Sequence, residues 1–165
     1  MDTFLGFKIN KYPYKEKIED TEHIYAHTKE GKPNELLEEH MELCIKYLKD
    51  IETEKKLRNT FDRFYAVFFG EYQENDLCKK MFFELIYNAV YTHDLGKTNK
   101  NFQSLKMANE YFEQFSKDIN CNKESGHSML SAIMYLDYYV KYILSIEELE
   151  IPVPSPIFRI PSPDT

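Results

Sequence analysis

Apolar and polar residues recur along this chain with the period of an α-helix over most of its length. The segment ELLEEHMELCIKYLKDI follows Asn34, which we interpret as an N-cap. In it, Leu36, His40, Leu43 and Tyr47 are spaced at steps of four, three and four. This spacing places them on one face of a helix, so the pattern predicts that His40 lies on the buried stripe.

Four more helical segments follow in the sequence. The second helix is expected at about residues 55 to 69 and ends at Gly70. The third begins near Asn75 or Asp76, and Gly96 closes it. The segment NKNFQSLKMANEYFEQFSK predicts a fourth helix or a pair of helical turns, and CNKESG predicts a loop. A fifth helix starts at about Ser125.

Two of these later helices carry a histidine near one end. Phe82, Leu85, Ala89 and His93 are spaced at steps of three, four and four, which puts His93 on the apolar face of the third helix. His127 lies in the first turn of the fifth. Both are therefore expected at the interior of the fold.

The two ends of the chain lack this helical period. The first 30 residues leave room for a short hairpin. The last 15 residues, IPVPSPIFRIPSPDT, contain five prolines, which remove backbone donors and exclude a helix. We therefore expect an all-α domain of five or more helices over residues 1–150, followed by an extended proline-rich tail over residues 151–165.

Charge and cysteine content narrow the function classes. The chain has 21 Lys and Arg against 28 Asp and Glu, a net charge of -7, which disfavours a broad basic face for nucleic acid. A metal-dependent phosphodiesterase stays open, because bound cations supply positive charge locally. Cys44, Cys78 and Cys121 form no disulfide framework or zinc ribbon. With no signal peptide or membrane span in the sequence, we expect a soluble cytoplasmic protein without a membrane partner.

The chemistry is concentrated in three separate helices. His40, His93 and His127 each occupy the interior face or buried end of a different helix, so convergence on one crevice is the simplest explanation. Asp94 stands beside His93, and a carboxylate there can bridge two cations. Lys97 either contacts a phosphate oxygen or is a solvated lysine at a helix C-terminus, and both readings stay open.

The motif YTHDLGKTNKNFQ resembles the signature of the HD superfamily of metal-dependent phosphohydrolases. A closer resemblance is to the HD nuclease of type I CRISPR systems, found alone or fused to a helicase. It rests on YAHT at 25 to 28, LLEEHMELC at 36 to 44, HDLGK followed by NFQ, and GHSMLSA at 126 to 132, in that family's order and at roughly its intervals. The resemblance covers residues 25 to 140.

The resemblance implies an all-helical nuclease that hydrolyses single-stranded DNA. Its metal ions would be divalent: Mn, Mg, Ni, Co, Fe or Zn. By this resemblance, His40, His93 and Asp94 match ligands of a first metal, and Asp94 and His127 match ligands of a second. Lys97 matches a lysine near the scissile phosphate, which makes Asp94 and Lys97 the expected catalytic residues. The implied partners are a CRISPR helicase and an RNA-guided surveillance complex.

The remaining histidine of the motif set, His27, matches the family's AHS stretch, where a structural or peripheral role is expected. The chain also departs from the family pattern. Gly126 and Ser128 flank His127 where the family usually has Arg and Glu, and no histidine follows His127 to match a downstream metal-binding region. We therefore expect a domain truncated at its C-terminus, incomplete or weakly active as given. Apolar surface should then be exposed on the last helix, with self-association or docking of the tail as its consequence.

Two other functions stay open at this point. One is a general HD phosphohydrolase that acts on nucleotides. The other is a degenerate HD-like module that binds a partner or nucleic acid without cleaving.

Overall fold

The computed structural model describes residues 2–70, 75–115 and 126–146, and helices dominate these residues. The predicted all-α class is thereby confirmed, and the proline-rich tail lies outside the described residues. The α-helices are α1 (Tyr14–Lys17), α2 (Leu37–Lys55), α3 (Leu57–Phe68), α4 (Asp76–Tyr91), α5 (Lys100–Met107) and α6 (Gly126–Leu144). Short 3-10 helices are η1 (Thr21–His23), η3 (Leu95–Thr98) and η4 (Glu110–Phe115).

Two small antiparallel pairs accompany the helices. The strands β1 (Asp2–Phe4) and β2 (Phe7–Ile9) form a hairpin, for which the sequence left room. Leu5 and Gly6 turn it with φ of 49° and 84°, a conformation with positive φ at both turn positions that closes two-residue hairpins. The strands β3 (Tyr25–His27) and β4 (Glu35–Leu36) form the second pair.

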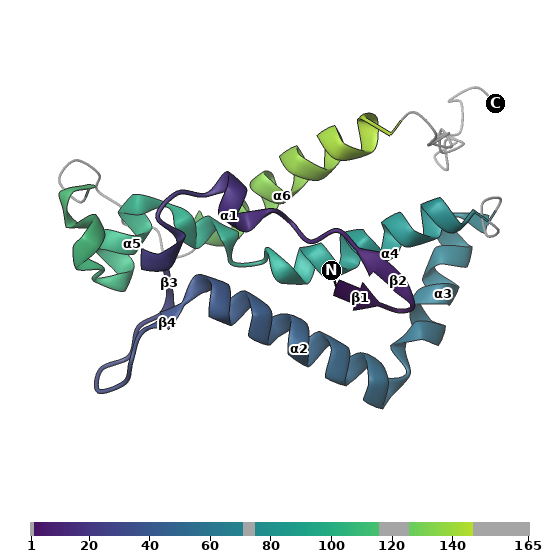
Figure 1. Ribbon diagram of the computed structural model, residues 1–165, viewed down its shortest axis with the longest axis horizontal. Coiled ribbons are helices and arrows are strands. Elements are labelled where there is room, and N and C mark those ends of the chain that lie inside the picture. The colour runs from purple at the N-terminus through teal and green to yellow at the C-terminus, as the bar shows by residue number, and fades with distance from the viewer. Residues whose placement is uncertain (1, 71–74, 116–125, 147–165) are drawn as a thin grey trace, which may run out of the picture.

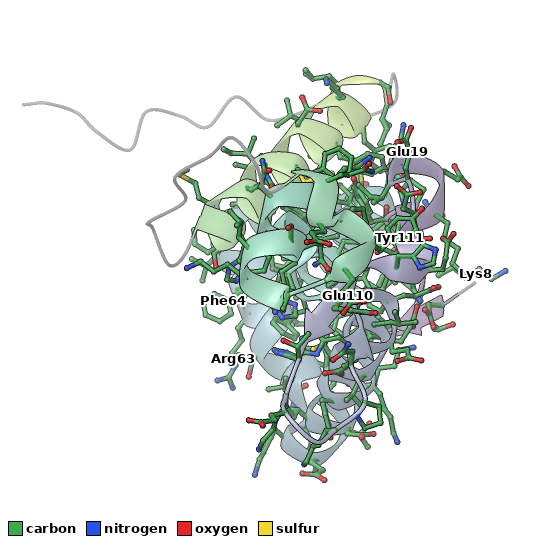
Figure 2. The ribbon with its side chains drawn as sticks, turned by 90° about the vertical axis from the view of Figure 1, so that its left-hand side faces the viewer. Lys8, Glu19, Arg63, Phe64, Glu110 and Tyr111 are labelled. Carbon is green, nitrogen blue, oxygen red and sulfur yellow. The ribbon has the colours of Figure 1, made fainter. Side chains whose placement is uncertain are left out.

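The core lies where the N-terminal hairpin, α2 and α4 meet. In Figure 1, α2 and α4 diverge from each other, with β1 and β2 beside α4. The helix α6 packs against η3. Aromatic side chains supply much of this core, and the buried ones include Phe4, Tyr12, Tyr14, Phe83, Tyr87, Tyr91, Phe112 and Tyr139. Charged side chains such as Lys8, Glu19 and Glu110 lie on the outside (Figure 2).

The start and the buried face of α2 differ from the prediction. The helix begins at Leu37 rather than after Asn34, because Glu35 and Leu36 pair with β3. Its buried side chains are Leu37, Met41 and Ile45, whereas Leu43 and Tyr47 are exposed. The predicted stripe was therefore wrong by one residue step, and His40 lies at the edge of the buried face, with its side chain 16% exposed.

The start of α4 was predicted correctly and its end was not. Asn75 caps the helix, since its side-chain oxygen accepts a hydrogen bond from the Cys78 backbone N–H at 3.0 Å. The helix ends at Tyr91, and Gly96 lies within η3 instead of closing α4. His93 therefore stands in a turn between the two helices, with 42% of its side chain exposed, and not on the apolar face of α4.

The other helices match their predictions closely. The segment expected at 55 to 69 is α3, the fourth segment forms α5 and η4, and His127 lies in the first turn of α6. The predicted CNKESG loop lies outside the described residues except for its last glycine. No helix among the described residues is both long and apolar enough to cross a membrane.

The outer face of α6 carries exposed apolar side chains, as expected for this helix. They recur at helical spacing and are Met129, Ile133, Leu136, Val140 and Leu144, each at least half exposed. The predicted exposure is confirmed over the described part of the helix. Self-association, or docking of the tail on this face, stays a prediction.

Candidate metal centre

The carboxylate of Asp94 is surrounded by every other residue that the sequence proposed for the site. His40 Nε2 lies 3.4 Å and His93 Nε2 lies 3.5 Å from its Oδ2 atom. His127 Nε2 lies 3.6 Å from Oδ1, on the other side. Lys97 Nζ lies 2.8 Å from Oδ2. The structure thus brings together side chains from α2, the turn after α4, η3 and α6.

A tight series of turns places His93 and Asp94 between α4 and η3. The hydroxyl of Thr92 donates to the Asn88 carbonyl at 2.7 Å, which occupies an acceptor at the end of α4. The backbone N–H of Lys97 then donates to the Asp94 carbonyl at 2.9 Å, and η3 begins. Because the chain changes direction here, the two adjacent side chains can face the same crevice.

Asp94 and Lys97 form a buried ion pair. Asp94 is 7% and Lys97 is 5% exposed, and the Lys97 ammonium also donates to the Ala26 carbonyl at 2.9 Å. Burial by itself would raise the pKa of Asp94, but Lys97, His93 and His40 together hold that pKa below its ordinary value. The prediction of a solvated lysine was wrong, because the ammonium is buried. The phosphate contact stays a prediction.

Two of the three imidazoles are fixed through their second ring nitrogen. Nδ1 of His40 lies 3.3 Å from the Glu35 carboxylate, and Nδ1 of His93 lies 2.8 Å from the Val90 carbonyl. Both acceptors favour an N–H at Nδ1, and in the neutral rings this leaves Nε2, the nitrogen beside Asp94, with the lone pair that a metal ligand needs. A carboxylate or carbonyl behind a histidine is the usual support of a metal ligand. Sequence reasoning missed Glu35, which lies in β4, two residues before α2 begins, and stands beside His40.

His127 is placed by a close contact between η3 and α6. The Gly96 backbone N–H donates to Ser131 Oγ at 2.7 Å, and that hydroxyl donates to the His127 carbonyl at 2.9 Å. A Cβ atom at Gly96 would lie 1.9 Å from the same carbonyl oxygen, so only glycine permits this approach. Among the described residues, His127 Nδ1 is buried without a hydrogen-bond partner.

The remaining histidines lie beside the crevice or away from it. The His27 ring is T-shaped to that of His40 with centroids 4.7 Å apart. Burial, followed by the positive charges of Lys97 and His40, lowers the pKa of His27. His23 lies away from the crevice and stacks on Tyr111, with ring centroids 3.8 Å apart.

Gln103, the glutamine of the NFQ motif, supports the crevice from behind. Its side chain is fully buried, and its Nε2 donates to the carbonyls of Tyr25 and Lys97, at 2.8 Å each. Its Oε1 accepts from the Tyr25 backbone N–H at 2.9 Å and from Asn109 Nδ2 at 3.0 Å. It thereby joins β3, η3 and α5. The NFQ motif contains this residue, but the sequence analysis assigned it no role.

The donor spacing suits a metal ion. Two ligands at about 2.0 to 2.1 Å from a tetrahedral ion lie about 3.3 to 3.4 Å apart. The two Nε2 to Oδ2 separations, 3.4 and 3.5 Å, have this size, so one ion fits between His40, His93 and Asp94. Two nitrogens and a carboxylate oxygen also suit first-row transition ions. On the Oδ1 side, the described residues offer Asp94 and His127 as ligands for a second ion, fewer than on the Oδ2 side.

Two surface hollows adjoin the crevice. The first lies between the end of α4 and α6 and is lined in part by His93, Ser128 and Tyr135. The second, between α5 and the start of α6, is lined in part by Phe102 and His127. The rings of Phe102 and His127 are 5.1 Å apart between centroids. Each hollow is thus lined by one histidine of the Asp94 cluster, His93 in the first and His127 in the second.

Comparison of the chain with protein-family models, curated proteins and solved structures yields no match. Functional inference therefore depends on the side chains around Asp94 and on the sequence motifs that carry them.

Proposed function

We propose that this protein is a metal-dependent phosphodiesterase of the HD type that cleaves single-stranded DNA. The observation that carries the proposal is the arrangement around Asp94. His40 and His93 approach one carboxylate oxygen at 3.4 and 3.5 Å, and His127 approaches the other at 3.6 Å. One carboxylate shared between two histidine groups is what a two-metal phosphodiesterase needs.

Each residue around Asp94 has a definite part in this proposal. A divalent metal bound here would acidify a water molecule and neutralise charge on a phosphate oxygen. Asp94 would bridge the two positions, His40 and His93 would hold the first, and His127 the second. Glu35 keeps His40 in its productive tautomer. Lys97 keeps Asp94 ionised and adds positive charge beside the phosphate site.

The hollow beside His127 supports a polymeric substrate. Phe102, Lys106, Asn99 and Asn101 are among the residues that line it. An aromatic ring stacks on a base without regard to sequence, and a lysine and amides pair with phosphate and sugar oxygens. A single strand can use these groups in series, whereas base-paired DNA does not present its stacked faces.

The proposed partners are inferred from the order of the sequence motifs alone, and not from a contact in the structure. We propose that a CRISPR helicase and an RNA-guided surveillance complex deliver the displaced single strand to the crevice. A chain with a net charge of -7 is not expected to have a broad basic surface that captures DNA by itself. Delivery by a partner removes the need for such a surface.

Nicking of circular single-stranded DNA with Mn²⁺ tests the proposed activity. Replacing His40 or His93 by glutamine should abolish nicking and lower the bound manganese, because each change removes a ligand nitrogen. The matched control is His23→Gln, since His23 contacts Tyr111 and not the crevice. If the His40 and His93 variants nick as fast as the parent, the activity does not arise at Asp94 and the proposal fails.

The same preparation separates the two other functions. Release of phosphate from nucleotides without nicking of DNA indicates a general phosphohydrolase. Tight binding of manganese and single-stranded DNA without either reaction indicates a binding module. Both outcomes preserve the metal site and overturn the proposed nuclease.

A further inference from the structure

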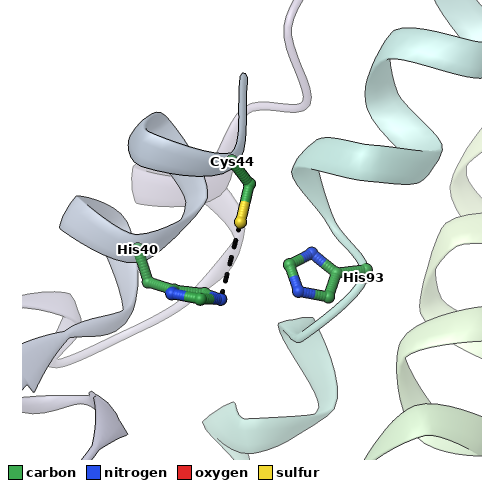
Figure 3. A group of neighbouring side chains, drawn as sticks. All are labelled: His40, Cys44 and His93. Carbon is green, nitrogen blue, oxygen red and sulfur yellow. Dashed lines mark hydrogen bonds between the residues drawn. The ribbon is translucent and has the colours of Figure 1, made fainter. Parts of the chain in front are cut away.

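Cys44 lies in the same crevice; it ends the LLEEHMELC motif, but the sequence analysis assigned it no role. It stands one helical turn after His40 on α2, so the two side chains project from the same face. Its Sγ atom is 3.6 Å from Nε2 of His40. Figure 3 shows the thiol and both imidazoles turned toward a common space, with His93 opposite α2. Ligand atoms of His40, Cys44 and His93 all lie within 4.8 Å of one another.

The 3.6 Å between Cys44 Sγ and His40 Nε2 is the separation expected for two ligands of one zinc ion. Zinc lies about 2.3 Å from a cysteine sulfur and about 2.0 to 2.1 Å from a histidine nitrogen. For a tetrahedral ion these lengths put sulfur and nitrogen about 3.5 to 3.6 Å apart. The pair Cys44 and His40 matches that separation, and a ring nitrogen of His93 lies within 4.8 Å of both ligand atoms.

We propose that His40, Cys44 and His93 form a thiolate-containing zinc site, with Asp94 beside it as the fourth ligand. This inference rests on the metal-binding part of the proposed function and deepens it by assigning a different ion to the same crevice. The donor set is two imidazole nitrogens, one sulfur and one carboxylate oxygen. Thiolate favours zinc over manganese or magnesium, which prefer oxygen donors.

The binding step balances as a ligand exchange without a change of oxidation state. The zinc ion forms a bond to the Cys44 sulfur, the thiol releases one proton to solvent, and water leaves the ion. Four protein ligands close a tetrahedral zinc site, whereas a catalytic site keeps one position for water. The zinc form would therefore be the closed, inactive form, and zinc would regulate the crevice by competing with the hydrolytic ion.

Cobalt is the probe that tests the assignment, because Co²⁺ takes zinc sites and gives a near-ultraviolet charge-transfer band only with a thiolate ligand. The metal-free protein is titrated with CoCl₂ under reducing conditions, and the spectrum is followed at each addition. Three variants are compared with the parent: Cys44→Ser, Cys78→Ser and Cys121→Ser. Cys78 is the matched control from the described residues, a free cysteine in the first turn of α4. Circular dichroism verifies that each variant is folded.

The expected result is a charge-transfer band in the parent and in the Cys78 and Cys121 variants, lost in Cys44→Ser. Zinc affinity, measured by competition with a chelating dye, should fall about tenfold or more in Cys44→Ser. Cobalt binding without the band would overturn the role of Cys44 and leave the proposed nuclease standing. A band lost in another cysteine variant would also overturn it. No cobalt binding at all would sink the zinc site and the proposed metal centre together.

Discussion

The Lys97 ammonium lies 2.8 Å from Asp94 Oδ2, in a place where the lysine is only 5% exposed. Its other partner is the carbonyl of Ala26, at 2.9 Å. Removing one half of a buried ion pair leaves an uncompensated charge and typically costs about 3 to 5 kcal/mol. Any change at Asp94 therefore affects stability as well as the proposed chemistry.

Accordingly, Asp94→Ala should lower the free energy of unfolding by about 3 kcal/mol. The double variant Asp94→Asn/Lys97→Met removes both charges and should regain most of that loss. Urea unfolding of the parent, the single variant and the double variant measures both numbers. Equal stability of the single and double variants would contradict the importance of this pair. The double variant also serves as a folded negative control for nicking.

Gly96→Ala should be strongly destabilising for steric reasons. The added methyl group would lie 1.9 Å from the His127 carbonyl oxygen, so η3 and α6 would have to separate. Overpacking of this kind costs about 1 to 3 kcal/mol or more. Gly70→Ala is the matched control, because a Cβ there meets no atom of the described residues within 4 Å. Thermal unfolding followed by circular dichroism compares the two, and equal melting temperatures would show that α6 moves aside without cost.

Asp2 should make stability depend on pH below neutrality. Lys49, Tyr87 and Lys11 hold the pKa of Asp2 well below its usual range, against the opposing effect of burial. Because the folded pKa is the lower one, the ionised carboxylate stabilises the fold above about pH 4. This contribution is lost as the pH falls from there through the folded pKa.

The variant Asp2→Asn should lower the free energy of unfolding at pH 7 by about 1 to 2 kcal/mol. Its difference from the parent should shrink as the pH is lowered below about 4. Asp50→Asn, a change at an exposed carboxylate on α2, is the control and should alter stability little at either pH. Urea unfolding across this pH range gives the curves. A difference that stayed constant down to pH 2 would mean that the network does not bind the ionised form.

Manganese should raise the melting temperature of the parent. An ion that binds only the folded chain at about 100 times its dissociation constant adds about 2.7 kcal/mol. For a chain of this size that corresponds to about 5 to 10 °C. A chelator should reverse the shift, and His40→Gln should reduce it, whereas His23→Gln should not. An identical shift in both variants would place the ion outside the crevice.

Sequence periodicity predicted the helices well but not their buried faces. The cap at Asn75 and the start of α6 near residue 126 depend on a few neighbouring residues, and both positions were predicted correctly. The start of α2 depends instead on pairing of Glu35 and Leu36 with a strand distant in sequence. No local pattern contains that pairing, and the one-step error in the buried stripe follows from the same kind of long-range contact.

The candidate site was predictable as a set of residues and not as a structure. His40, His93, Asp94, Lys97 and His127 were all proposed from motif spacing, and all of them meet at one carboxylate. Supporting groups such as Glu35, Gln103 and Cys44 went unassigned, because their roles arise from which side chains face each other after folding. Burial of Lys97 was missed for the same reason.

The contact between Gly96 and the His127 backbone also gives a criterion for recognising distant relatives. A relative that keeps the histidine of α6 in the crevice has to keep glycine at the position of Gly96, since any side chain would meet that backbone. It also needs a small hydroxyl residue four positions after the histidine, as Ser131 is here, to bond both partners. These three positions form a signature that spans two separate motifs. A search with it can find chains whose overall sequences have diverged beyond alignment.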